Sequence, residues 1–232
     1  ERPVLARIAV AQGFYGGGLI AASPLYALVY VDRLNLSLAD VGVIGILAAI
    51  ANTVAFPVWG IVSDRLGALA ALWMGSAIGV ASVIAYAFAP NVLVLWIAAL
   101  AAGTASGAID VGIAAAVSDH TSMATRAAAM AGWNALTGAR GIVAAFLMSL
   151  LLQVGLIDVR FGLLACAASS TIGVVMFVRA SRAVSSGAAA NRVRPDSSAP
   201  PIRPIATPGT PAVAATAATG TSVAPDAPVA VG

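Results

Sequence analysis

Six long apolar segments constrain this chain more than any other feature. They cover roughly residues 4–31, 38–63, 67–89, 91–118, 124–155 and 160–180. Each is long enough to cross a bilayer, because a membrane-spanning helix needs about 20 mostly apolar residues. The chain is 60% hydrophobic and 9% charged, against about 25% charged residues in a soluble domain. The sequence therefore predicts an all-α integral membrane protein, a bundle of six transmembrane helices.

The connections between the segments carry most of the charge and predict the orientation. Six spans bring both termini to the same side of the membrane. The loops and ends on that side hold Arg2, Arg7, Arg65, Arg126, Arg179 and Arg182, whereas the opposite side holds only Arg33 and Arg160. Because cytoplasmic loops carry an excess of basic residues, we expect a multi-pass protein of the cell membrane with both termini in the cytoplasm.

The composition changes after Arg182. Residues 183–232 contain no aromatic residue and eight of the twelve prolines. Such a segment cannot bury enough apolar surface to fold. We expect a membrane part over 1–182 and a disordered, Pro/Ala-rich cytoplasmic tail over 183–232. Since the chain starts with Glu1 rather than Met, we also expect it to be a fragment of a longer protein.

Charge and cysteine content argue against several classes of partner. All twelve basic residues are arginines, and they are dispersed, so nucleic acid is not an expected partner in spite of the net charge of +3. Cys166 is the single cysteine and lies in an apolar segment, where packing is its expected role. No cluster of metal-ligating residues occurs in the sequence, and we expect neither a metal nor a cofactor.

One enzymatic interpretation has to be tested. Ser106-Gly107 in the fourth span resembles part of the motif of rhomboid intramembrane proteases. A serine nucleophile needs an adjacent base, which that family supplies from its sixth helix, where this chain has no histidine. Its single histidine, His120, lies in the fourth connection. We therefore expect no catalytic residues and no enzyme, and interpret Ser106-Gly107 as a small-residue packing face.

The most informative connection is the one between the second and third spans, residues 60–67. It contains Gly60, Asp64, Arg65 and Gly67 within eight residues. Gly60 would let another helix approach closely, and Gly67 would permit a tight reversal. An aspartate in such a turn can face the positive end of a neighbouring helix. A solvated polar turn is the alternative.

The pattern Gly-x-x-x-Asp-Arg-x-Gly resembles the signature loop of the major facilitator superfamily of secondary transporters. It departs from that loop at Ala68 and Leu69, where the N-terminal copy usually continues with basic residues and the C-terminal copy is commonly degenerate. Arg126, before a run of small residues, is similar to the arginine that opens the fifth helix of a half. Thr121 or Ser122 can cap that helix.

This resemblance implies the fold and the function. It covers residues 4–182 and implies one half of a twelve-helix transporter, six helices built of two inverted three-helix repeats. The degenerate loop favours the C-terminal half, with the N-terminal half as the alternative. The implied function is transport of a small solute, by uptake or efflux, through alternating access together with a missing half or a second copy. A non-transporting membrane module that acts as an assembly partner is the competing hypothesis.

Polar residues inside the spans are candidates for the substrate or coupling-ion site. A polar face in lipid must look at protein or water. In the first span, which we expect to be interrupted at Gly16-Gly17-Gly18 and Pro24, such a face includes Gln12 and Tyr26. The full set of candidates is Gln12, Tyr15, Tyr26, Asn52, Asp110, Asn134 and Arg140.

Asp110 and Arg140 allow two interpretations. A charge at mid-membrane costs about 2.5–3.5 kcal/mol on insertion scales, so each residue needs a partner or a function. At 1.5 Å of rise per residue their depths differ by roughly 8 Å. A structural ion pair and a role in transport both remain open, and for proton coupling Asp110 is the only intramembrane carboxylate.

Overall fold

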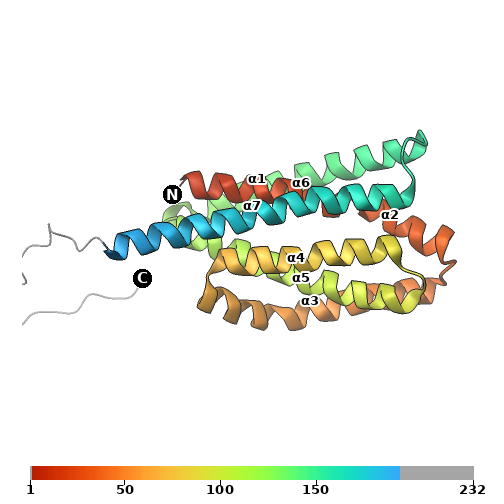
Figure 1. Cartoon of the computed structure of the whole chain (residues 1–232), viewed down its shortest axis with the longest axis horizontal. Coiled ribbons are helices and arrows are strands. Elements are labelled where there is room, and N and C mark those ends of the chain that lie inside the picture. The colour runs from red at the N-terminus through yellow and green to blue at the C-terminus, as the bar shows by residue number, and fades with distance from the viewer. Residues whose placement is uncertain (1, 194–232) are drawn as a thin grey trace, which may run out of the picture. The chain divides into compact units, whose positions relative to one another are not determined.

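The computed structural model describes residues 2–193, and all regular structure in that part of the chain is helical. The elements are α1 (Arg2–Ala21), α2 (Ser23–Leu28), the short π-helix η1 (Val29–Arg33), α3 (Leu38–Leu66), α4 (Ala68–Phe88), α5 (Val92–His120), α6 (Met123–Gln153) and α7 (Val159–Val193). Figure 1 shows the long helices side by side along one direction.

Six helical stretches are long and apolar enough to cross a membrane, which confirms the six predicted spans. They are Val4–Arg33, Leu38–Leu66, Ala68–Phe88, Val92–His120, Met123–Gln153 and Val159–Ser186. The last helix, α7, continues to Val193, beyond the expected end of the membrane part at residue 182. The rest of the predicted tail, residues 194–232, lies outside the described residues.

The first span breaks at only one of the two places where we expected an interruption. α1 runs without interruption through Gly16-Gly17-Gly18 and ends at Ala21. The break comes just before Pro24, which occupies the first turn of α2, where a missing N–H costs nothing. The backbone hydrogen bond from Ala22 N to Gly18 O, at 3.1 Å, carries the ladder up to this break. Unlike proline, glycine keeps its backbone N–H and can donate the helical hydrogen bond. Three glycines in a row therefore do not end α1, which is packed against α6 and α7.

Local hydrogen bonds explain where the later helices begin. Ser37 and Asp40 form a reciprocal capping box at the start of α3, and Asn91 Oδ1 accepts from Val94 N at 3.2 Å before α5. The expectation for α6 was only partly right. Ser122 occupies the N-cap position, but its side chain accepts no backbone N–H. Its hydroxyl instead lies 2.9 Å from the Thr125 hydroxyl.

The helices pack in two groups of three. α3, α4 and α5 contact one another, while α1 packs against both α6 and α7. Contacts between α4 and α7 join the two groups, as Figure 1 also shows. The fourth span therefore packs with the second and third, and the first span packs with the fifth and sixth.

Small residues and hydroxyl groups hold these interfaces together. Gly75 lies directly against the side chain of Ala108, and Gly103 against the backbone of Ala48. Across α1 and α7, the Ser170 hydroxyl donates to Tyr15 O at 3.0 Å. Helix association in lipid depends on such close approach and on interhelical hydrogen bonds, each worth about 0.6–2 kcal/mol.

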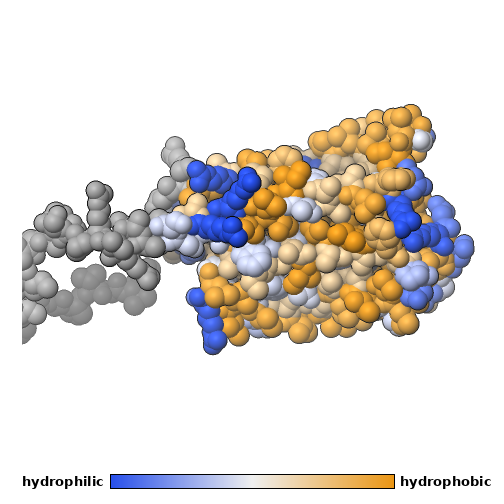
Figure 2. Space-filling model, in the orientation of Figure 1, coloured by the Kyte–Doolittle hydropathy of each residue, from blue (hydrophilic) through white to orange (hydrophobic). Residues whose placement is uncertain are grey.

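Burial is very uneven among the helices. In the apolar window of α4, 61% of the residues are buried inside the bundle, against 11% in α3 and 6% in α6. Met148 is the single buried residue that the structure records on α6. Figure 2 shows the resulting apolar surface along the length of the bundle, with hydrophilic residues gathered at its two ends. α3 and α6 thus expose most of their surface.

The turn at Gly67 gives the first testable prediction. Gly67 has φ +90° and ψ 155°, a backbone region that is almost exclusive to glycine and costs other residues about 1–3 kcal/mol. Gly67→Ala should therefore lower the thermal midpoint of the detergent-solubilised protein. Gly42→Ala is the matched control, because Gly42 is an exposed α3 residue and a Cβ added to it would meet no atom within 4 Å. Equal midpoints for the two variants would contradict the prediction.

Candidate functional site

The connection at residues 60–67 is tighter than its sequence suggested. Asp64 and Arg65 belong to the last turn of α3, and Gly67 alone separates α3 from α4. Both charged side chains are exposed. A Cβ added to Gly60 would meet no atom within 4 Å. The close approach that we expected at Gly60 is therefore not made by any described part of this chain, and this end of α3 is left open.

Arg126 ties the end of α5 to the start of α6. It lies in the first turn of α6 and donates from Nη2 to the carbonyl oxygen of Ser118, at 3.1 Å. Its Nε is buried and has no partner among the described residues. A carbonyl oxygen at the C-terminal end of α5 carries partial negative charge, which a cation stabilises. Arg126 therefore closes the connection next to its own helix start.

Arg140 lies in a notch that the glycines of α1 leave open. Its Nη1 donates to the backbone oxygen of Gln12, at 2.6 Å. A Cβ on Gly16 would lie 2.6 Å from Nη2 and 2.9 Å from the guanidinium carbon, and one on Gly17 would lie 3.8 Å from Cδ. Any larger residue at Gly16 would displace the guanidinium group. Gly16 and Gly17 thus leave the space that the Arg140 side chain occupies inside the membrane-spanning bundle.

Asp110 and Arg140 do not form a structural ion pair. Within residues 2–193 neither side chain has an oppositely charged group within ion-pair distance, and Asp110 is exposed on α5. Arg140 bonds to a backbone carbonyl instead, and its Nε is buried without a partner in the same part of the chain. Asn134, on the same helix as Arg140, is also exposed. Of the two interpretations of these charges, the structural pair is therefore not supported.

The other candidates on the first span are packed inside the bundle. Gln12 and Tyr15 are buried, and the Tyr15 hydroxyl occupies the space that Gly79 of α4 leaves free. Tyr26 stacks on Tyr86 with ring centroids 4.3 Å apart. Gln12 and Tyr15 therefore line no open surface in this structure, whereas Tyr26 is only partly buried.

Asn52 of α3 lies against α5. Its Oδ1 is buried without a hydrogen-bond partner among the described residues, and a Cβ on Gly107 would lie 3.1 Å from it. Gly103 and Gly107 form the packing face of α5, whereas Ser106, which we assigned to that face, is exposed. The hydroxyl points away because Ser106 is about 100° around the helix from Gly107.

A sequence model of the Major Facilitator Superfamily matches residues 8–225. The match covers most of the chain and includes the signature loop, Arg126, Asp110 and Arg140. The chain belongs to this superfamily. A search of curated proteins returned no match.

Membership decides the broad class. Proteins of the superfamily move small solutes across membranes, and the described part of this multi-pass membrane protein has six helical stretches long and apolar enough to span a bilayer, the number found in one facilitator half. Among the described residues no three metal-ligating side chains lie together.

The sequence had marked Arg33 and Arg160 only as indicators of orientation, but in the structure both act on the end of α4. Arg33 Nη1 donates to Ala87 O at 2.8 Å, and the Arg160 guanidinium lies over the Phe88 ring, 4.4 Å from its centroid. A cation at a helix C-terminus is favourable. The two arginines thus fasten the first and sixth spans to the third at this end of the bundle.

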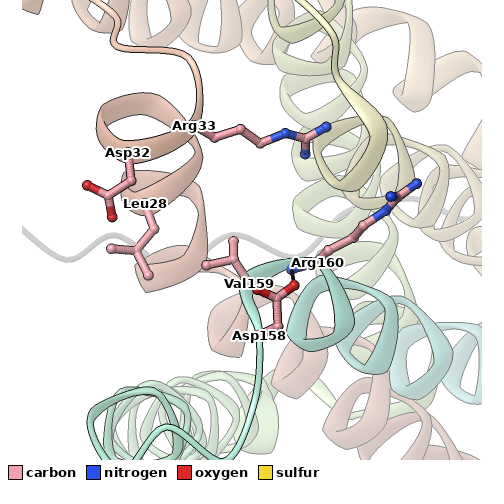
Figure 3. Close-up of a pocket in the computed structure, with 6 residues that line it drawn as sticks. All are labelled: Leu28, Asp32, Arg33, Asp158, Val159 and Arg160. Atoms are coloured by element: carbon pink, nitrogen blue, oxygen red, sulfur yellow. Dashed lines mark hydrogen bonds between the residues drawn. The ribbon is translucent and has the colours of Figure 1, made fainter.

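These arginines line a cavity of about 360 Å³ together with Leu28, Asp32, Asp158 and Val159. Figure 3 shows the two guanidinium groups extending to one side of it and Asp32 pointing to the other. Asp158 accepts a bond from the Arg160 backbone N at 3.1 Å and so begins α7. The sequence did not predict that Arg33 and Arg160 line the same cavity, because the two residues are far apart along the chain.

The notch at Gly16 gives the second testable prediction. Gly16→Ala should displace the Arg140 guanidinium and remove its bond to Gln12 O, and hydrogen bonds to charged groups contribute about 1.5–3 kcal/mol. The thermal midpoint of the purified protein should fall, whereas Gly13→Ala, with no atom within 4 Å of the added Cβ, should leave it unchanged. In an Arg140→Met background Gly16→Ala should become nearly neutral. An unchanged effect in that background would disprove the coupling.

Proposed function

We propose that this chain is one half of a secondary transporter that moves a small solute by alternating access. The single observation that carries the proposal is the pair of intramembrane charges, Asp110 and Arg140, which lie within spans and do not neutralise each other. Membrane proteins rarely keep such charges without a function. The family match supplies the class of function.

The exposed faces of α3 and α6 support a partner of six more helices or a second copy. On α3 a regular stripe of apolar side chains is exposed at helical spacing, formed by Val43, Ile46, Ile50, Val54, Val58 and Ile61. α6 is the least buried span and carries both Arg140 and Asn134. Because polar groups in lipid are costly, we infer that these faces meet another half across a central cavity.

The packing pattern supports two inverted three-helix repeats. If the first, second and third spans correspond to the fourth, fifth and sixth, then the contact of α5 with α3 and α4 corresponds to that of α1 with α6 and α7. The contact between α4 and α7 joins equivalent helices. In each case the first helix of one repeat packs against the second and third helices of the other repeat. A two-fold relation between the repeats would produce this pattern.

Within this proposal the candidate residues have distinct roles. Asp110 is the titratable group available for a proton, and Arg140 is a fixed positive charge for the solute or for a carboxylate of the other half. Asn52 and Asn134 are further candidates, and Gln12, Tyr15 and Tyr26 would act from the packed first span. Gly60, Asp64, Arg65, Gly67 and Arg126 would form the gating contacts.

The assignment to a C-terminal half and the cytoplasmic position of both termini remain proposals. The degenerate signature loop supports the first, and the six arginines at one side support the second. Since a Cβ added to Gly60 would meet no atom within 4 Å among the described residues, we infer that a helix of the other half packs against it.

The third prediction tests a role in transport against a structural role. A removed partner in a buried pair leaves an uncompensated charge, and removal of the second partner then rescues stability. Because Asp110 and Arg140 do not pair, Asp110→Asn and Arg140→Gln should each reduce transport per molecule of inserted protein, and the double variant should show no rescue. The assay is solute accumulation in proteoliposomes under an imposed pH gradient, over a panel of sugars, amino acids, organic acids and lipophilic cations.

Two outcomes would contradict this prediction. Rescue of both abundance and transport in the double variant would show that the two charges serve as a structural pair. Absence of accumulation for every solute, with the wild-type protein correctly inserted and paired with its partner half, would favour a non-transporting membrane module. Ser106→Ala, an exposed neutral change one turn from Asp110, serves as the control.

The fourth prediction concerns the interface with the other half. The second helix of one half meets the fifth helix of the other in this family. Ile61 is 54% exposed on α3, whereas Val62 packs against Trp59 and its neighbours, so Ile61 is the better position for a cysteine. Ile61→Cys and Ala127→Cys, with Cys166 replaced, should each cross-link to a partner half or a second copy. Leu156→Cys, an exposed position at the opposite end of the bundle, should not.

A further inference from the structure

A second charged cavity lies at the end of the bundle where the chain begins. It has a volume of about 220 Å³ and is lined by Arg7 of α1 and by Met176, Arg179 and Ala180 of α7. At this end Figure 2 shows hydrophilic surface over α1 and α7, directly beside apolar surface. The proposed transport site does not include any of these residues.

Among the described residues, no acidic side chain pairs with the two arginines of this cavity. The helical segments Arg2–Ala21 and Val159–Val193 contain no acidic residue at all. Arg7 and Arg179 are both exposed and, within the described part of the chain, no hydrogen bond or ion pair engages either guanidinium group. Two guanidinium groups that flank one cavity match the planar, multiple hydrogen bonding of a phosphate.

The position of the cavity along the helix matches the edge of the bilayer core. Arg179 follows Val159, the first residue of α7, by twenty residues, which at 1.5 Å per residue is about 30 Å. That distance equals the thickness of the hydrocarbon core, about 30 Å. With Val159 taken as the opposite edge of that core, this spacing puts Arg179, and Arg7 in the same cavity, at the level of lipid headgroups.

The apolar part of the lining lies on the membrane side. Met176 precedes Arg179 by three residues, so it lies nearly one turn closer to the membrane centre on the same side of α7. The two arginines thus line the outer part of the cavity, and the Met176 side chain lines the part closer to the membrane centre. This order of chemistry, charge outside and apolar contact inside, is the order found along a phospholipid from its phosphate to its acyl chain.

We propose that this cavity binds the phosphate of an anionic phospholipid, with Arg7 and Arg179 on the phosphate oxygens and the first acyl carbons against Met176. Basic pockets between membrane helices are suited to such headgroups. The bound lipid would bridge the first and sixth spans without taking part in solute binding. The proposal is independent of the substrate and of which half the chain represents.

The experiment measures lipid retention by the full chain. The protein is purified from nanodiscs that contain equal amounts of phosphatidylglycerol and phosphatidylcholine with identical acyl chains, and the bound lipids are counted by native mass spectrometry. Wild-type protein should retain phosphatidylglycerol preferentially. The Arg7→Gln/Arg179→Gln double variant should lose at least tenfold of that preference, and the Arg7→Lys/Arg179→Lys variant should keep part of it.

The matched control is Arg182→Gln. Arg182 is an exposed arginine on the same helix, three residues beyond Arg179, and it does not line the cavity. Its loss should leave the preference for phosphatidylglycerol unchanged. An equal loss in Arg182→Gln would show a general charge effect and would overturn the site. Unchanged retention by the double variant, with circular dichroism equal to wild type, would overturn it as well.

A further arm separates the two possible sources of the phosphate. Glycerol 3-phosphate and inorganic phosphate are added in excess during lipid exchange. Neither should displace phosphatidylglycerol, because both lack the acyl chain that contacts Met176. Displacement by either soluble anion would show that the site binds free phosphate and would contradict the lipid assignment.

Discussion

The absence of water in the bilayer interior is the constraint on which the rest of this structure depends. Each polar group inside a span must find a partner within the protein. The side chains here do so mainly by donating to backbone carbonyls: Ser170 to Tyr15, Ser82 to Ala98 and Trp59 to Thr104. Each such bond crosses between two helices, so the need for a partner also fixes which helices are neighbours.

Small residues make these bonds possible, because a donor reaches a carbonyl of the next helix only when the two backbones are close. A Cβ on Gly173 of α7 would lie 2.6 Å from the backbone oxygen of Ala11 on α1, so the two helices are nearly in backbone contact. Gly16 offers the same space to the Arg140 guanidinium. Glycines on α1 and α7 therefore allow the close packing of helices and, at Gly16, the placement of the Arg140 side chain against α1.

The same constraint explains the difference between the covered and the uncovered parts of the bundle. α4 is packed on several sides by α5 and α7, whereas α3 and α6 are covered on one side only. Apolar side chains on an uncovered face are acceptable in lipid, but the exposed Asn134 of α6 and the exposed Asp110 of α5 are costly there. In the proposed function, a partner half would cover these polar groups and turn the space beside them into a water-filled cavity.

The length and hydropathy of each segment by themselves determined the membrane class, the number of spans and most of their ends. The second span was predicted to begin at residue 38 and the fifth at 124, and the helices begin at Leu38 and Met123. These features are local, since spanning requires only enough apolar residues in a row. The tight turn at Gly67 could also be predicted from the sequence, because few residues other than glycine adopt its backbone conformation.

Only the tertiary structure decided which polar side chains meet. Asp110 and Arg140 do not pair, Tyr15 is buried against Gly79, and Arg33 and Arg160 meet at the end of α4. These outcomes depend on how each helix is rotated about its axis and which neighbours it contacts. Spans that are apolar around most of their circumference do not encode that rotation, because lipid is as apolar as the protein interior. It is set by the fit of small residues on one helix against backbone on another.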